Sequence, residues 1–126
     1  MKHSILVIDD ESFNRQIIID ILGRAEKEYS VMSANSGKIG CELAEKFSPD
    51  LILMDWMMPE MTGLEALIRL KAQQKTKHIP VIMVTGVTAP EKLKEAFKVG
   101  MDDYISKPVN DTELLTKVES SLNIRE

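Results

Sequence analysis

The sequence predicts an α/β fold: a doubly wound five-stranded parallel sheet with helices on both of its faces. Two observations predict it. Five short apolar runs alternate with five segments that have helical apolar spacing, and repeated strand–helix units are typical of parallel sheets. Three of the runs are nearly continuous in Ile, Leu, Val and Met, as expected for strands that are buried on both faces.

The expected strands are short and apolar. In chain order they are Ser4–Ile8, Tyr29–Ala34, Leu51–Met54, Val81–Val84 and Tyr104–Ile105. Periodicity does not reveal the order in which the strands lie in the sheet. The order 2-1-3-4-5, that of flavodoxin-like (βα)5 folds, is common for five strands, and we expect it here.

Each expected helix carries one apolar stripe, which should face the sheet. In chain order the stripes are Phe13, Ile17, Ile18, Ile21 and Leu22; Ile39, Leu43, Ala44 and Phe47; Leu64, Leu67 and Ile68; Leu93, Ala96 and Phe97; and Leu114, Leu115, Val118 and Leu122.

Residues at the helix ends support these boundaries. Thr62-Gly-Leu-Glu65 matches a capping box at the start of the third helix. Asn110, followed by Glu113, matches a similar start for the fifth. Pro90 suits the first turn of the fourth helix, and Gly100 stands where that helix should end.

The composition indicates one globular domain that covers residues 1–126, with 44% hydrophobic and 29% charged residues. A net charge of −4 without a basic run argues against direct binding to nucleic acid. The lone Cys41 allows neither an internal disulfide nor a Cys₄ zinc site, which indicates a reducing compartment. The start lacks the apolar region of a signal peptide, and no apolar run approaches about 18 residues. We therefore expect a cytoplasmic protein that is not membrane-bound.

Polar residues directly follow several expected strands. Asp9 and Asp10 follow the first strand, Asp55 the third, Thr85 the fourth and Lys107 the fifth. Ligands of such sheets bind outside the carboxyl ends of the strands, so we expect these five side chains to converge on one crevice. Taken singly, each has a plainer explanation: the Asp9-Asp10 pair, for example, could simply cap the first helix.

The residue types of this set suit phosphoryl transfer. Three clustered carboxylates repel one another or bind a cation, and a few oxygen ligands with positions left for water and phosphate are what Mg²⁺ prefers. With a divalent ion and one lysine, the formal charges of the set sum to zero. Positioning and charge neutralisation are the main needs of phosphoryl transfer, and an Asp can be the nucleophile.

The ordered motifs resemble the receiver domain of two-component response regulators over essentially the whole chain. They are Ile-Leu-Val-Ile-Asp9-Asp10-Glu, Leu-Ile-Leu-Met-Asp55-Trp-Met-Met-Pro59-Glu-Met-Thr-Gly63, Val-Thr85-Gly and Lys107-Pro108. The resemblance implies that Asp55 is the phosphoacceptor and that the phosphoryl group comes from the phosphohistidine of a sensor histidine kinase or phosphotransfer protein.

The same resemblance implies the other roles. Asp9, Asp10, Asp55 and the backbone carbonyl of Met57 would hold Mg²⁺, with Mn²⁺ as a second candidate ion. Thr85 and Lys107 would bind the phosphoryl oxygens, and Pro59, Gly63 and Pro108 would support the loops, with a cis peptide bond expected at Lys107-Pro108.

The resemblance also implies the output. Thr85 and Tyr104 would form a switch acting on the face built from the fourth helix, fifth strand and fifth helix. That face would control an output domain or protein partner, or a phosphorylation-linked homodimer. A static, half-buried Tyr104 is the alternative. The chain ends at Glu126 without a closing Gly or Pro, which favours a receiver cut from a longer regulator over a stand-alone one.

Two other functions share parts of the pattern. A flavodoxin-like FMN-binding module needs a phosphate-cradling loop after the first strand, but that loop here contains Asp9-Asp10-Glu11. A phosphohydrolase with an aspartyl-phosphate intermediate needs an acid–base Asp two residues after its nucleophile, and Met57 stands there.

Two further expectations concern single residues. The indole of Trp56, which follows Asp55, should lie beside the metal site and not in the deep core. Asp102-Asp103 precedes the fifth strand, at the end opposite the crevice, and should form a solvated turn.

Overall fold

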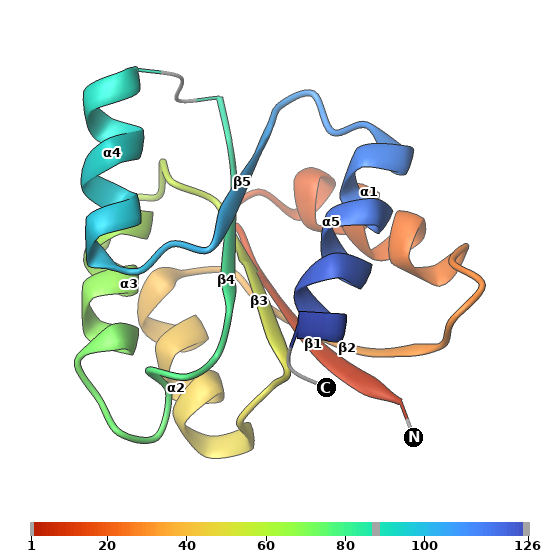
Figure 1. The fold of residues 1–126 in the computed structure, drawn as a ribbon, viewed down its shortest axis with the longest axis horizontal. Helices are drawn as coiled ribbons and strands as arrows, with labels where there is room; N and C mark the ends of the chain where they lie inside the picture. The colour runs from red at the N-terminus through yellow and green to blue at the C-terminus, as the bar shows by residue number, and fades with distance from the viewer. Residues whose placement is uncertain (1, 87–88, 125–126) are drawn as a thin grey trace.

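The sheet of this protein is parallel and has the strand order β2-β1-β3-β4-β5 (Figure 1). The structure is a computed structural model that describes residues 2–86 and 89–124. Strands and helices alternate along the chain: β1 (His3–Ile8), α1 (Ser12–Gly23), β2 (Tyr29–Ala34), α2 (Gly37–Phe47), β3 (Leu51–Met54), α3 (Gly63–Lys71), β4 (Val81–Thr85), α4 (Pro90–Val99), β5 (Asp103–Ser106) and α5 (Asp111–Ile124). The predicted fold class and strand order are confirmed.

Helices cover both faces of the sheet. Helices α2, α3 and α4 lie on one side, and α1 and α5 lie on the other (Figure 1). Successive residues of a strand point to opposite faces, so Leu6 and Ile8 pack toward α2–α4 while Ile5 and Val7 pack toward α1 and α5. This two-sided burial is the reason why the central strands read as continuous apolar runs.

The predicted helix ends are present. Thr62 and Glu65 form a reciprocal capping box at the start of α3. Pro90 is the first residue of α4, and Gly100 ends that helix with a positive φ of 131°. The side chain of Asn110 accepts a hydrogen bond from the Glu113 N–H at 2.9 Å.

Not every apolar stripe is buried. Phe13 is 75% exposed, so the first residue predicted for the core stripe of α1 lies outside the core. Phe47, Ile68 and Phe97 are also exposed, whereas the inner positions Ile18, Ile21 and Leu22 are buried. Helical spacing shows which side of a helix faces the sheet but not how much of that side the sheet covers. Residues at the margin of the apolar stripe or at a helix end can therefore stay exposed.

Asp102 is exposed, as expected, but its carboxylate is bound by neighbouring groups, and Asp103 belongs to β5 and not to a turn. The Asp102 Oδ2 accepts a hydrogen bond from the Val81 N–H at 2.8 Å and lies 3.7 Å from the Lys71 ammonium. Asp103 is the first residue of β5 and pairs with Lys117 at 3.2 Å. The two carboxylates satisfy main-chain donors at the start of β4 and along β5, which sequence spacing cannot reveal.

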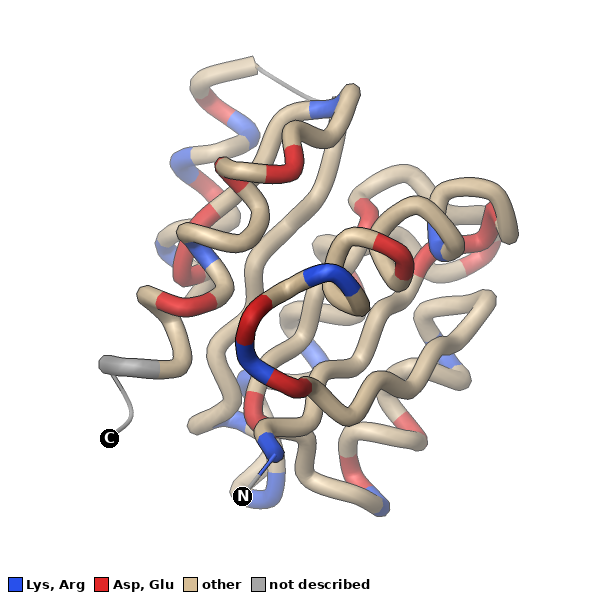
Figure 2. Tube along the Cα trace, turned by 90° about the vertical axis from the view of Figure 1, so that its right-hand side faces the viewer, with Lys and Arg blue, Asp and Glu red and all other residues tan. Residues whose placement is uncertain are grey.

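Charge is mixed over the surface. Acidic and basic positions are interspersed along the chain (Figure 2). None of the helices among the described residues is long and apolar enough to span a membrane.

Candidate functional site

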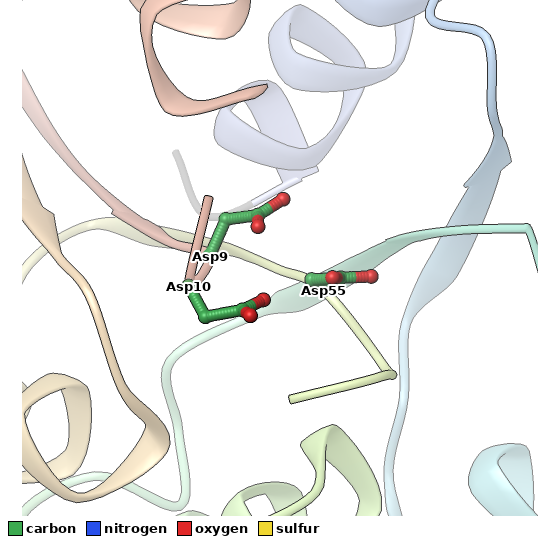
Figure 3. A group of neighbouring side chains, drawn as sticks. All are labelled: Asp9, Asp10 and Asp55. Carbon is green, nitrogen blue, oxygen red and sulfur yellow. The ribbon is translucent and has the colours of Figure 1, made fainter. Parts of the chain in front are cut away.

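The carboxyl ends of the central strands bring together three carboxylates from two separate segments. Asp9 and Asp10 follow β1, and Asp55 follows β3. One carboxylate oxygen of each residue lies within 4.8 Å of the others, and Figure 3 shows the side chains of Asp9 and Asp10 extending toward Asp55. The predicted convergence of these acids is therefore observed.

The main chain holds two of these acids in line with the sheet. The Asp9 N–H donates to the Ala34 carbonyl at 3.1 Å, and the Asp55 N–H donates to the Ile8 carbonyl at 2.9 Å. Asp9 is 1% exposed and Asp55 is 5% exposed, while Asp10 is more open to solvent. Two carboxylates are thus fixed in low-dielectric surroundings, with a third at the rim.

Lys107, in the loop after β5, contacts two of the three acids. Its ammonium lies 3.3 Å from Asp9 Oδ2 and 3.4 Å from Asp55 Oδ1. Its backbone N–H donates to the carbonyl of Thr85 at 3.0 Å, which couples the loop after β5 to the end of β4. Thr85 itself is buried, and the Lys107-Pro108 peptide bond is cis.

The surroundings raise the pKa of Asp55 above its ordinary value. Burial is the largest cause, and the neighbouring Asp9 carboxylate adds to it. Lys107 and the hydrogen bond from the Trp56 N–H act in the opposite direction but do not outweigh them. The ionised form of Asp55 is therefore less favourable here than for an Asp in water.

The donor set fits a hard divalent cation. The three clustered residues offer carboxylate oxygens, and two of the residues are buried. The ammonium of one lysine is the positive charge that contacts them. Such a set favours an ion that takes oxygen ligands and brings positive charge. The side chain of Met57 is 65% exposed, and the ligand role of its backbone carbonyl stays a prediction.

The loop between Asp55 and α3 is closed by main-chain hydrogen bonds. The Met61 N–H donates to the carbonyl of Pro59 at 2.8 Å, and the Gly63 N–H donates to the carbonyl of Trp56 at 2.8 Å. A Cβ on Gly63 would collide with the Asp55 carbonyl oxygen and would lie 2.7 Å from the Trp56 Cα. Only glycine lets α3 begin this close to the acid.

Replacing Gly63 with Ala is therefore expected to destabilise the fold by about 2–3 kcal/mol, because backbone atoms must move to admit the methyl group. Urea unfolding followed by circular dichroism measures the change. The control is Gly23→Ala, because a Cβ there meets nothing within 4 Å. Equal stability of the two variants would contradict the close-approach argument.

Trp56 is not where it was expected. Its side chain is only 5% exposed and belongs to the core between the sheet and helices α2–α4. Its backbone, in contrast, is at the site, since its N–H donates to Asp55 Oδ1 at 2.8 Å. The expectation rested on Trp56 being the sequence neighbour of Asp55, but the two side chains point in different directions and the indole packs in the core.

Tyr104 lies between two helices at the open edge of the sheet. Its ring meets the ring of Phe97 from α4 edge to face, with centroids 6.4 Å apart. From α5, the Lys117 ammonium donates to the Tyr104 carbonyl at 2.7 Å and lies 5.4 Å from the ring centroid. The Asp103 carboxylate accepts from the Tyr104 N–H at 2.8 Å. Tyr104 is therefore half-buried and contacts both helices.

Sequence reasoning missed two neighbours of the site. The Arg15 guanidinium donates to the carbonyl of Asp9 at 2.8 Å. A groove of about 280 Å³ lies beside Lys107 and is lined by Phe13, Asn14, Ile17, Ile18, Lys107, Pro108 and Val109. Each neighbour had a visible feature in the sequence. Arg15 is a cation near a helix start, where the helix dipole disfavours it. Phe13, which lines the groove, is the first apolar residue of its stripe.

Known proteins similar to this chain share one domain. The response regulator receiver domain family matches residues 5–119. The chain is 33% identical to the chemotaxis protein CheY of Halobacterium salinarum, over 97% of this chain and 98% of that protein. It is 36% identical to histidine kinase P4 of Formosa agariphila, over 98% of this chain but 9% of that protein. The chain spans less than two-thirds of the first three curated relatives, 9%, 26% and 51% of their lengths.

Solved structures give the same result. Chemotaxis protein CheY4 of Vibrio cholerae matches with a TM-score of 0.89 at 33% identity, over 97% of this chain and 100% of that one. The receiver domain of sensor histidine kinase PA1611 from Pseudomonas aeruginosa matches with a TM-score of 0.87 at 26% identity, over 98% and 99%. The latter structure is described as having a magnesium ion coordinated in its active site cleft.

Proposed function

Because this chain belongs to the response regulator receiver domain family of two-component signalling, we propose that it accepts a phosphoryl group on Asp55. The donor is the phosphohistidine of a sensor histidine kinase or phosphotransfer protein. Residues 1–126 act as one receiver domain, expected in the cytoplasm. It is a signalling phosphoacceptor that catalyses only its own phosphotransfer and slow dephosphorylation, not an enzyme that turns over other substrates.

The observation that carries this proposal is the placement of Asp55. It is a buried acid at the carboxyl end of a central strand, and its Oδ1 lies 3.4 Å from the Lys107 ammonium. A carboxylate oxygen of Asp55 attacks the phosphorus atom of phosphohistidine. A P–O bond forms as the P–N bond breaks, and the imidazole nitrogen keeps the electron pair and takes up a proton from solvent. The product is an aspartyl phosphate.

The acidic cluster would hold a divalent cation for this reaction. The carboxylates of Asp9, Asp10 and Asp55 and the backbone carbonyl of Met57 would be its protein ligands. Mg²⁺ is the expected ion and Mn²⁺ the second candidate. When bound, the ion neutralises charge on the phosphoryl oxygens. Its charge also opposes the effects that raise the pKa of Asp55 and so favours the ionised nucleophile.

The phosphodonor would approach along the groove beside Lys107. Phe13 and Pro108 form its exposed apolar margins, and Lys107 connects it to Asp55. An exposed phenylalanine in the same groove as the lysine that contacts Asp55 is suited to contact with a protein donor, because apolar surface near a reactive group helps to orient a large substrate.

The output would leave through the face of α4, β5 and α5. Thr85 would bind the phosphoryl group and move toward it, and Tyr104 would take up the vacated space. Such a change has two discrete packings. An output domain, a protein partner or a second copy of the chain would recognise the altered face.

The test of the function is phosphorylation of the protein by acetyl phosphate, with and without EDTA. Intact mass should increase by one phosphoryl group only when Mg²⁺ is present. Steady turnover of a phosphomonoester would instead support the phosphohydrolase alternative, and flavin absorbance in the purified protein would support the FMN-binding one. No mass increase with Mg²⁺ would contradict the proposal.

Replacing Thr85 with Ala is expected to separate phosphorylation from the output. Asp55 should still be phosphorylated. The factor by which phosphorylation changes the equilibrium of β5 and α4 should fall by about tenfold, since the hydroxyl no longer links the phosphoryl group to β4. Amide hydrogen exchange of these elements with and without phosphorylation measures this. Thr85→Ser keeps the hydroxyl and should retain the response; an unchanged response in Thr85→Ala would favour a static Tyr104.

A further inference from the structure

Arg15 lies in α1 but reaches back to the loop that precedes the helix. It is the fourth residue of α1, and its backbone N–H donates to the carbonyl of Glu11 at 3.1 Å. Its guanidinium Nη1 donates to the backbone carbonyl of Asp9 at 2.8 Å. Arg15 therefore ties the first turn of α1 to the end of β1.

This contact is one of four that hold Asp9. The Asp9 N–H donates to the Ala34 carbonyl at 3.1 Å. Its Oδ1 accepts from the Glu11 N–H at 3.0 Å, and its Oδ2 accepts from the Lys107 ammonium at 3.3 Å. The carbonyl bond from Arg15 fixes the peptide that joins Asp9 to Asp10, the two neighbouring acids of the cluster.

The start of α1 is an unfavourable place for an arginine. Its N-cap residue, Glu11, makes no side-chain capping hydrogen bond, and its first turn has no acidic residue. A cation near a helix N-terminus interacts unfavourably with the helix dipole. An arginine at this place breaks a local rule, and such breaks are typical of residues that serve a functional site.

We propose that Arg15 is a positioning residue for the Asp9-Asp10 acids. By holding the Asp9 carbonyl it fixes the loop so that both carboxylates already face Asp55 before a cation arrives. Preformed ligands bind more tightly because less ordering is left to occur on binding. This inference rests on the proposed function only in that a divalent cation binds at Asp9, Asp10 and Asp55.

The test compares Mg²⁺ affinity in three variants. Arg15→Met keeps the length of the side chain and removes its donors, whereas Arg15→Lys keeps one charged donor. Gln16→Met is the matched control on the next residue, whose exposed side chain hydrogen-bonds to Asp20. The dissociation constant is obtained from the rise in melting temperature with Mg²⁺ concentration.

Arg15→Met is expected to bind Mg²⁺ about tenfold more weakly, as is usual for loss of a partner that orients a ligand. Arg15→Lys should recover part of the loss, and Gln16→Met should bind like the parent. Without metal, amide exchange at the Glu11 N–H should be faster in Arg15→Met, because the Asp9 carboxylate it donates to is less fixed.

A lower melting temperature of Arg15→Met with an unchanged dissociation constant would overturn the proposal and leave Arg15 a purely structural residue. Should Arg15→Met not fold, Arg15→Lys carries the test, and parent-like affinity together with parent-like exchange at Glu11 would overturn it. Failure of the proposed function would look different, since the parent itself would then neither bind Mg²⁺ nor accept a phosphoryl group.

Discussion

The Asp55→Asn variant is expected to gain no phosphoryl group when it is incubated with acetyl phosphate and Mg²⁺. The amide keeps the volume of the carboxyl group but is not a nucleophile. Asp9 also contacts Lys107, but its other oxygen already accepts a hydrogen bond from the Glu11 N–H. Intact mass spectrometry measures the adduct, and peptide mapping of the parent locates it. The control is Asp20→Asn, an exposed site on α1, which should be phosphorylated like the parent. A full-yield adduct in Asp55→Asn would refute the assignment.

The same variant is expected to be more stable than the parent at neutral pH without metal. The folded-state pKa of Asp55 is raised, so its ionised form opposes folding at a pH above that value. The neutral amide removes this cost. The advantage of Asn should decrease as the pH falls through the raised pKa, where the parent carboxyl becomes neutral too. Urea unfolding across the acid range with EDTA measures both effects. A stability gap that widens toward low pH would contradict the expected pH dependence.

Replacing Asp10 with Ala is expected to weaken Mg²⁺ binding by about 100-fold or more. Loss of a residue that merely orients a ligand costs 10–100-fold, and here an oxygen ligand itself is removed. Phosphorylation at limiting Mg²⁺ should fall with it. Without metal the variant should be more stable than the parent, on the order of 1 kcal/mol, since one of three crowded carboxylates is gone.

Thermal melts with EDTA and with increasing Mg²⁺ measure both parts of this prediction. Glu11→Ala is the matched control, because the neighbouring Glu11 side chain accepts a hydrogen bond from Asn14 at 3.0 Å and is not one of the three clustered acids. It should leave the Mg²⁺ affinity close to that of the parent. If Asp10→Ala proved less stable than the parent without metal, Asp10 would instead serve the start of α1.

The reach of sequence reasoning differs between parts of the site. Asp9, Asp55, Thr85 and Lys107 could be grouped in advance because each stands at or just after the carboxyl end of a strand. The carboxyl ends of parallel strands meet at one edge of the sheet. Arg15 stands out in the sequence as a cation near a helix start, but nothing in the sequence connects it to these acids. Its role depends on its side chain extending back past the helix start to the Asp9 carbonyl. The spacing of residues along the chain does not predict that contact.

Trp56 and Phe13 illustrate a similar difference. The sequence predicts the indole of Trp56 beside the metal site and Phe13 in the core stripe of α1, but the indole lies in the core and the phenyl ring is exposed. Which way a side chain at a strand end or helix end points depends on the packing space left by other elements, and that space is a property of the assembled fold.

By itself the sequence determined the number of strands and helices, their order along the chain and the two-sided burial of the strands. It also determined the capping box of α3 and the acidic residues of the site. These follow from local periodicity and from the chemistry of residues at strand ends. The tertiary structure alone decided the links between distant segments: Arg15 on Asp9, Lys107 between two acids, Asp102 on Val81 and Lys117 on Tyr104. Long flexible side chains have many rotamers of similar energy, and only packed neighbours select the one that makes such a contact.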